Sequence, residues 1–323
     1  MEIDTRHICK LAVLAMSLAL PTLAQAAWPE RPVVMLVPFA PGGINDVLAR
    51  LTAERLQAAF GRSFVVENEP GAAGVLAASR VARAQPDGYT LFFSTISQIA
   101  IAPFTHKIDF DPLKDFKPIS IVATTPFIIT VGKSFPASSL AEFAVYVRSR
   151  PGQLTFGSAG TGSLTHLASE VFLKSARLSM VHVPYKGVLP AFTDLLAGHV
   201  EMLAASPVEL RPYFGTDTVK LLAVTGAKRS RYLPDVPAVA EQFPAPEVVT
   251  WNGLLAPART PPDVIDALSR ELGAAERNPE FRKRLTDLGV DPEIDGPDEF
   301  ARIIAADHER WREIIRDLGL KVQ

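Results

Sequence analysis

Residues 33–51 read VVMLVPFAPGGINDVLARL, and this stretch decides the fold class. Val33–Val37 is a short apolar run of strand length, whereas Leu48 and Leu51 recur at helical spacing. The loop Pro38–Gly43 between them is rich in proline and glycine, which separate one element from the next. The stretch therefore predicts a strand, a glycine loop and a helix, the repeating unit of an α/β fold.

The same alternation of strand and helix continues along the chain. Strands are predicted at Phe64–Glu67 and Thr90–Ser94, with a helix at Ala72–Ala84 between them. This alternation is typical of a mainly parallel sheet with helices on its faces. A long apolar run, Ile119–Val131, is broken at Pro126, as expected where the chain passes into a second lobe.

The rest of the chain repeats the pattern and predicts two lobes. Helical and extended segments alternate from Ser139 to Thr225, and the segment from Asp263 to Leu318 is predicted to be almost wholly helical. At about 100–200 residues per domain, the chain is long enough for two units. We therefore expect two α/β lobes with two crossings of the chain between them: a first lobe of residues 27–125 and 250–323, and a second lobe of residues 126–249.

Residues 1–26 have the pattern of a cleavable export signal. Two basic residues precede the apolar run Leu11–Leu20, and Ala24 and Ala26 supply small residues at the spacing of a cleavage site. The apolar run is far shorter than the roughly 20 residues that span a bilayer. The single cysteine, Cys9, lies within this signal, so the mature chain has no disulfide. We expect a soluble monomer in the periplasm.

Charge and motif content disfavour several classes of function. The formal net charge is −2, so we expect no basic surface of the kind that binds nucleic acid. The histidines have no metal-ligand spacing, and neither a P-loop nor a G-x-G-x-x-G after a strand occurs, so no metal or nucleotide cofactor is predicted. Phe156 stands where the first glycine of a nucleophile elbow around Ser158 would be, which disfavours a serine hydrolase.

Each predicted lobe contains a loop of small residues between a strand and a helix. Such loops let backbone N–H groups approach a ligand, and the start of a helix adds unpaired donors and a partial positive charge. Two loops converging from opposite lobes predict an anion site, although each glycine also serves simply to turn the chain into its helix. The residues are Phe39, Ala40, Pro41, Gly42 and Gly43 in the first lobe, and Ser158, Ala159, Gly160, Thr161, Gly162 and Ser163 in the second.

Polar residues near these loops allow more than one interpretation. Asp46 either caps the helix that follows the first loop or meets a polar group of the ligand. His166 lies in a helical segment, where it packs or caps, but an enzyme would pair it with Ser158. Tyr185 and Lys186 follow a predicted strand and form either a surface turn or a part of the site.

A series of short motifs in a fixed order extends over most of the chain. They are Trp28-Pro29, Val37 through Gly43 with Asp46, Glu67-Asn68, Pro70-Gly71-Ala72, Asp87 through Leu91, Ser158-Ala159-Gly160, His166-Leu167-Ala168 with Glu170, Val183 through Gly187, Leu222 through Thr225, Arg229, Pro234 through Pro237, and Trp251 with Gly253. In these motifs the chain resembles the substrate-binding receptors of tripartite tricarboxylate transporters, often called the Bug family.

The resemblance implies a Venus flytrap of the type II periplasmic binding class. Such a receptor closes around a small carboxylated solute and passes it, without chemistry, to the membrane subunits of a tripartite transporter. Its two glycine loops hold a carboxylate, partly through ordered waters, and these roles fall here on residues 39–43 and 158–163. A sensory receptor that signals to a membrane protein remains an alternative. The resemblance further implies that the variable side of the pocket is lined by Ser94, Thr95, Gln98, Ala204, Ala205 and Ser206.

Two departures from the family pattern stand out. Many relatives have an acidic or amide residue near Ala205, and alanine there removes a partner for an ammonium group. We therefore expect a carboxylate without an α-amino group, either aliphatic dicarboxylic or aromatic. Ala238 replaces a usual threonine, with no consequence that the sequence reveals.

Overall fold

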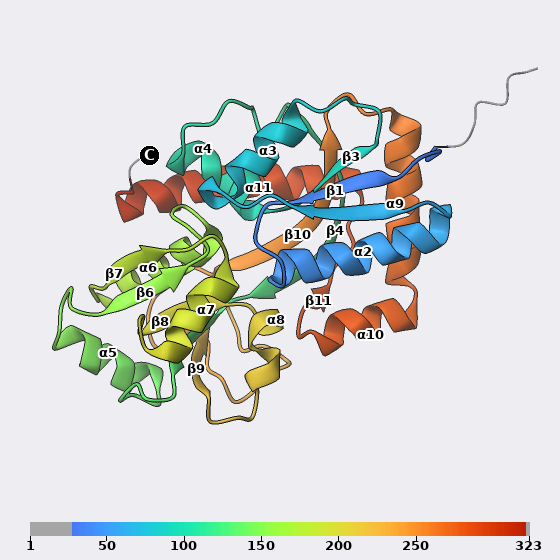
Figure 1. Cartoon of the computed structure of the whole chain (residues 1–323). Coiled ribbons are helices and arrows are strands. Elements are labelled where there is room, and N and C mark those ends of the chain that lie inside the picture. The colour runs from blue at the N-terminus through green and yellow to red at the C-terminus, as the bar shows by residue number, and fades with distance from the viewer. Residues whose placement is uncertain (1–27, 321–323) are drawn as a thin grey trace, which may run out of the picture.

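The computed structural model describes residues 28–320, so the predicted export signal and Cys9 lie outside the described residues. Figure 1 shows two lobes: the blue, cyan, orange and red parts of the chain form one, and the green and yellow parts form the other. Each lobe is a β-sheet flanked by helices. The predicted two-lobed α/β fold is therefore confirmed.

The first lobe contains a six-stranded mixed sheet in the order β11-β4-β10-β3-β1-β2. β1 pairs in parallel with β2 and β3, whereas β10 runs antiparallel to β3 and β4. The prediction of a mainly parallel sheet is wrong for the half of this sheet that contains β10. This strand enters from the second lobe and runs antiparallel to both of its neighbours. The strands are β1 (Val33–Val37), β2 (Phe64–Asn68), β3 (Thr90–Thr95), β4 (Phe116–Pro126), β10 (Val249–Pro257) and β11 (Asp291–Pro292).

Helices cover both faces of this sheet because its strands are apolar on both sides. Along β3, Phe92 packs with one group of helices, while Leu91 and Phe93 pack with the other, as the two-residue period of a strand requires. One face carries η1 (Ala72–Gly74), α3 (Val75–Ala82), η2 (Ser97–Ile101), α4 (Ala102–Thr105) and α11 (Pro297–Leu318); the other carries α2 (Ile44–Phe60), α9 (Pro262–Glu276) and α10 (Pro279–Asp287).

Two helix predictions in this lobe need correction. The helix predicted at Ala72–Ala84 begins only at Val75, because Ala72 and Ala73 adopt the left-handed conformation with φ of 47° and 51°. The C-terminal segment contains the short strand β11 between two of its helices. Within residues 28–320, no helix is both long and apolar enough to cross a membrane.

The second lobe contains a five-stranded sheet in the order β7-β6-β8-β5-β9. β6 pairs in parallel with β7 and β8, and β5 runs antiparallel to β8 and β9. The strands are β5 (Ile128–Gly132), β6 (Thr155–Ser158), β7 (Val181–Pro184), β8 (Met202–Ala205) and β9 (Val219–Val224); the helices are α5 (Leu140–Arg148), α6 (Leu164–Ala176), α7 (Val188–Ala197), α8 (Pro207–Leu210), η3 (Arg211–Tyr213) and η4 (Val239–Glu241).

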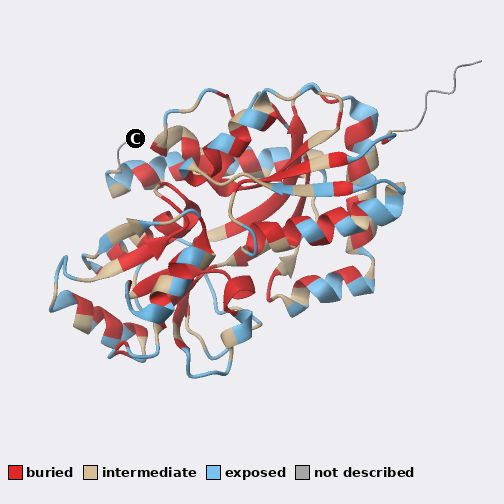
Figure 2. Ribbon diagram, viewed as in Figure 1, coloured by how far each residue is buried: buried red, intermediate tan, exposed pale blue. Residues whose placement is uncertain are grey.

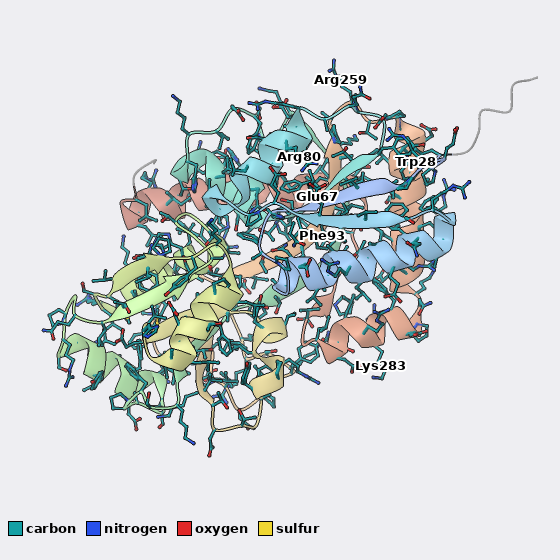
Figure 3. The ribbon with its side chains drawn as sticks, in the orientation of Figure 1. Trp28, Glu67, Arg80, Phe93, Arg259 and Lys283 are labelled. Carbon is teal, nitrogen blue, oxygen red and sulfur yellow. The ribbon has the colours of Figure 1, made fainter. Side chains whose placement is uncertain are left out.

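Burial follows this layered arrangement. Figure 2 shows that the central strands of both sheets and the inner faces of their helices are buried, while exposed residues lie on the outer faces of the helices and along the edge strands β2 and β7. At the edge of the first sheet, Arg80 of α3 pairs with Glu67 at 2.6 Å and Glu69 at 2.9 Å, and Figure 3 shows Arg80 beside Glu67. Such exposed pairs contribute at most about 1 kcal/mol each, so the apolar layers determine the fold.

The two lobes are joined where the chain crosses between the sheets. One crossing lies at Phe127, between β4 and β5, and the other runs from Thr225 to Val248, between β9 and β10. Thr225 links them: its N–H donates to the carbonyl oxygen of Phe127 at 2.9 Å, and its Oγ1 accepts from the N–H of Phe127 at 2.9 Å. The N–H of Val248 in turn donates to the carbonyl oxygen of Thr225 at 2.9 Å. These residues form the hinge.

Two histidines are stacked inside the second lobe. The rings of His166 and His182 lie 3.9 Å apart between centroids, and Phe156 stacks on His182 at 5.0 Å. Burial, together with the neighbouring His166, lowers the pKa of His182 to about 3. His182 is therefore neutral in the folded chain at neutral pH.

Replacing Thr225 with Val should destabilise the hinge, because the N–H of buried Phe127 loses its side-chain acceptor. We expect a loss of about 1–3 kcal/mol in the free energy of unfolding, measured by urea denaturation. Thr130→Val is the matched control, since the Thr130 hydroxyl donates to the carbonyl oxygen of Ile128 within the same strand. Equal losses in the two variants would contradict a special role for Thr225.

His182→Gln should make the free energy of unfolding less dependent on pH. The pKa of His182 is about 3 when folded and near its ordinary value of 6.5 when unfolded. The stability that this difference in pKa contributes is therefore complete above pH 6.5 and is lost as the pH falls toward 3. Over that range the unfolded chain binds a proton at His182 and the folded chain does not. Urea unfolding from about pH 7 to about pH 4 should show a steeper loss for the wild type than for the variant. Equal slopes for the wild type and the variant would contradict this role of His182.

Candidate functional site

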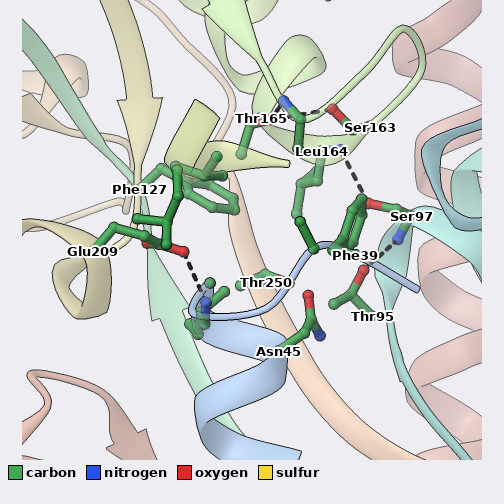
Figure 4. Close-up of a pocket in the computed structure, with 16 residues that line it drawn as sticks. Phe39, Asn45, Thr95, Ser97, Phe127, Ser163, Leu164, Thr165, Glu209 and Thr250 are labelled. Carbon is green, nitrogen blue, oxygen red and sulfur yellow. Dashed lines mark hydrogen bonds between the residues drawn. The ribbon is translucent and has the colours of Figure 1, made fainter. Parts of the chain in front are cut away.

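A narrow cleft, partly open to solvent, lies between the two lobes beside the hinge. Its walls are largely apolar, and both lobes contribute to them. Figure 4 shows the lining side chains around the cleft. They are Phe39, Ala40, Gly43, Ile44, Asn45, Thr95, Ser97 and Thr250 from the first lobe, Phe127 from the hinge, and Ala159, Ser163, Leu164, Thr165, Val188, Leu189 and Glu209 from the second.

The first glycine loop is shaped by its own polar contacts. The N–H of Gly42 donates to Asp46 Oδ2 at 2.9 Å, and Arg50 pairs with Asp46 at 2.9 Å. Burial raises the pKa of Asp46, but the hydrogen bonds from Arg50 and Gly42 outweigh it, so the pKa is lowered. Asp46 is therefore a buried carboxylate that closes the turn into α2. It does not cap that helix, whose N-cap is Gly43 with no side-chain cap, and it does not line the cleft.

The second glycine loop is held in the same manner at the start of α6. The N–H of Ala159 donates to Thr165 Oγ1 at 2.9 Å, and the N–H of Gly162 donates to His166 Nδ1 at 3.1 Å. Ser163 is the N-cap residue, and its Oγ accepts from the N–H of His166. The N–H of Thr165 has no partner inside the helix, and it lies at the cleft.

The lobes contact each other directly across the cleft. The N–H of Leu164 donates to Ser97 Oγ at 3.0 Å, and the N–H of Ile44 donates to Glu209 Oε1 at 2.8 Å. Glycine permits the closest approach: a Cβ on Gly162 would lie 2.6 Å from the His106 ring of the first lobe. The structure is therefore a closed form.

Glu209 is a cleft residue that the sequence analysis missed. It is only 4% exposed, on the short helix α8 of the second lobe. Its side chain and that of Ser206 form a capping box, the reciprocal pattern in which a serine and a glutamate three residues later bond each other's backbone. The spacing Ser206-Pro207-Val208-Glu209 carries this signal, but nothing in it indicates that the glutamate reaches the other lobe.

A second, more polar cavity adjoins the first and shares Phe39 and Ala159 with it. Tyr185 and Lys186 line this outer cavity together with Gly160 and Thr161. The Tyr185 hydroxyl donates to Asp194 at 2.6 Å, and burial together with that carboxylate raises the pKa of Tyr185 to about 12.

Some of the predicted site residues line the two cavities, and the others do not. The predicted residues that line one of the two cavities are Phe39, Ala40, Gly43, Thr95, Ala159, Gly160, Thr161, Ser163, Tyr185 and Lys186. Those that line neither are Pro41, Gly42, Asp46, Ser94, Gln98, Ser158, Gly162, His166, Ala205 and Ser206.

Long-range packing explains why several of these residues lie outside the cavities. Gln98 is fully buried and directs its amide to the carbonyl oxygen of Ala73 at 2.7 Å. Ala205 pairs with Ile128 within the second sheet and is fully buried. Ala205 therefore does not line the cleft, so alanine at this position gives no reason to exclude a ligand that carries an ammonium group. Ala238 is also fully buried, and nothing in the structure explains its choice over threonine.

The serine and histidine considered for catalysis do not meet. Ser158 Oγ lies 2.7 Å from His182 Nε2, whereas His166 accepts from the loop and stands 3.6 Å from Glu170. Ser158 has no exposed surface, so its hydroxyl does not face the cleft. In the part of the chain that the structure describes, no three histidine, cysteine or acidic side chains are grouped as a metal site.

Comparison with known proteins gives a consistent result. The family model of the tripartite tricarboxylate transporter family receptor matches residues 48–320. Protein BugT of Bordetella pertussis is 32% identical over 303 residues, which are 92% of each chain. This match extends over nearly the whole of both proteins.

Solved structures agree with the sequence match. Rpa4515 of R. palustris, solved with adipate, has a TM-score of 0.89 and 33% identity, over 92% of this chain and 100% of that one. MatC (Rpa3494) of Rhodopseudomonas palustris, solved with bound malate, has a TM-score of 0.85 and 32% identity, over 89% and 100%. The resemblance drawn from the sequence motifs is confirmed: this chain belongs to the tripartite tricarboxylate transporter receptor family, the Bug family of periplasmic binding proteins.

Proposed function

We propose that this chain is a periplasmic receptor that closes its lobes around a small carboxylate and delivers it to the membrane subunits of a tripartite transporter. The observation that carries the proposal is the cleft between the lobes, where the N-terminus of α6 from one lobe meets the hydroxyl of Ser97 from the other. Helix-terminal N–H groups and hydroxyl donors favour an anion. Because these groups belong to different lobes, an anion bound by both favours the closed form.

The walls of the cleft support an organic acid with a hydrocarbon part. Phe39, Phe127, Leu164 and Val188 supply apolar surface. The hydroxyl-bearing residues of the lining are Thr95, Ser97, Ser163, Thr165 and Thr250. Adipate and malate, bound by the two relatives named above, combine carboxylates with a short carbon chain. Aliphatic dicarboxylic and aromatic acids both suit such walls.

The mechanism is closure about the hinge at Thr225, without chemical change of the ligand. The two moving units are residues 27–125 with 250–323, and residues 126–249. The chain acts as a monomer after export through the signal at residues 1–26. The family match and the position of both crossings at one side of the cleft support this proposal.

A thermal-shift screen of the mature protein against a panel of carboxylic acids tests the proposal. An acid at about 100 times its dissociation constant adds about 2.7 kcal/mol of stability, which should raise the melting temperature by about 5 °C. The panel should include aliphatic dicarboxylates and aromatic acids, with a neutral sugar as the negative control. A shift with the sugar and with none of the acids would refute the carboxylate, and turnover of a bound acid would indicate an enzyme.

Replacing Gly162 with Ala should weaken binding of the best acid from this screen at least about tenfold. The added Cβ would lie 2.6 Å from the ring of His106 across the cleft, so it opposes closure. Gly198→Ala is the matched control: Gly198 has a φ of 78°, close to the 75° of Gly162, but open space around its Cα. Isothermal titration calorimetry should therefore show a loss of affinity in the Gly162 variant alone.

A further inference from the structure

The cleft contains a buried carboxylate that no cation neutralises. Glu209 Oε1 accepts from the N–H of Ile44, and Oε2 accepts from the N–H of Ser206 at 3.0 Å and from its hydroxyl. Among residues 28–320, no lysine, arginine or histidine forms a salt bridge with Glu209. Its partners are therefore neutral donors and the N-terminus of α2, which is 17 residues long.

Glu209 keeps one free acceptor site in the cleft. Burial raises the pKa of Glu209, and the hydrogen bonds from Ser206 and Ile44 oppose that rise without cancelling it. Oε2 already accepts two hydrogen bonds from Ser206, whereas Oε1 accepts one from Ile44 and retains a further lone pair. The side chain lines the cleft.

Asn45 adds a second acceptor at the start of α2, and Figure 4 shows it beside Thr95. Its Nδ2 donates to Asn252 Oδ1 at 3.0 Å, and Figure 4 shows its carbonyl oxygen turned toward the cleft. Asn45 is 3% exposed and Asn252 is fully buried. The side of the cleft formed by α8 and the start of α2 therefore presents acceptors to a ligand.

The opposite side of the cleft presents donors. Ser97 Oγ accepts from the N–H of Leu164, which leaves its own hydrogen to donate. Ser163 and Thr165 line the same wall at the start of α6, where their hydroxyls share a hydrogen bond of 3.1 Å and the N–H of Thr165 has no partner inside the helix. Figure 4 shows Glu209 on one side of the cleft and Ser97 on the other, so the cleft has an acceptor end and a donor end.

We propose that Glu209 is a specificity-determining residue that selects carboxylates bearing a hydroxyl or ammonium group. The inference rests on the proposed function and deepens it. The ligand carboxylate lies at the donor end, near Ser97 and Thr165, and the hydroxyl or ammonium group donates to Glu209. A ligand without that group leaves the remaining lone pair of the buried Oε1 without a donor, and a second carboxylate placed there sets acceptor against acceptor, so both are disfavoured.

Matched acids that differ in one substituent test the inference by titration calorimetry on the mature protein. Succinate, malate and aspartate share one carbon chain, with hydrogen, hydroxyl or ammonium at C2, and 3-phenylpropionate and 3-phenyllactate form a larger pair. The wild type should bind the donor-bearing member of at least one series roughly 10- to 100-fold more tightly than its unsubstituted partner. Equal or reversed affinities in every series that binds would overturn the inference, while leaving the proposed function intact.

Variants then assign the preference to Glu209. Glu209→Gln should reduce the ratio between the affinities for the donor-bearing acid and its unsubstituted partner to about threefold or less, because a neutral amide is a weaker acceptor than a carboxylate. Glu241→Gln is the control, since Glu241 also accepts from the N–H three residues before it but is exposed and outside both cavities. A ratio unchanged by Glu209→Gln would overturn the inference even if the wild type shows the preference. Binding of no acid by the wild type would overturn the proposed function itself.

Discussion

The hydrogen bonds of Thr225 constrain the whole molecule, because they join both crossings of the chain at one point. Without them the two sheets would be linked by two independent strands. With them, Phe127, Thr225 and Val248 form one narrow connection between the lobes. On either side of this connection each strand pairs within the sheet of its own lobe. The cleft, its closure and the meeting of α2 with α6 all depend on this connection.

Local sequence was sufficient to predict the elements that make the two loops. A β-branched run followed by glycine and an amphipathic helix forms the same unit in either lobe, since neighbours along the chain decide it. The left-handed turn at Ala72 and Ala73 was not predictable, because alanine rarely adopts that conformation. The antiparallel course of β10 also escaped prediction, since it depends on how the second lobe returns the chain.

The cleft itself was predictable only in outline. The sequence places Phe39–Gly43 and Ser158–Ser163 in loops, but it does not show which side chains face inward. Ser158 turns away to His182, and Gln98 turns away to Ala73. Glu209 turns in, because its short helix is directed at the other lobe. Contacts between residues 24 to 165 positions apart decide the chemistry of the cleft, and such contacts leave no local pattern.

Phe39 links the proposed closure to the heat capacity of binding. It projects from the first lobe and packs against the apolar cluster of the second, beside Val188, Phe192 and Leu203. Each closing event therefore removes hydrocarbon surface from water even before the ligand is counted. Burial of that surface lowers the heat capacity, so the enthalpy of capture becomes more favourable as the temperature rises. The temperature dependence of binding heat thus reports the movement of the protein as well as its contacts with the solute.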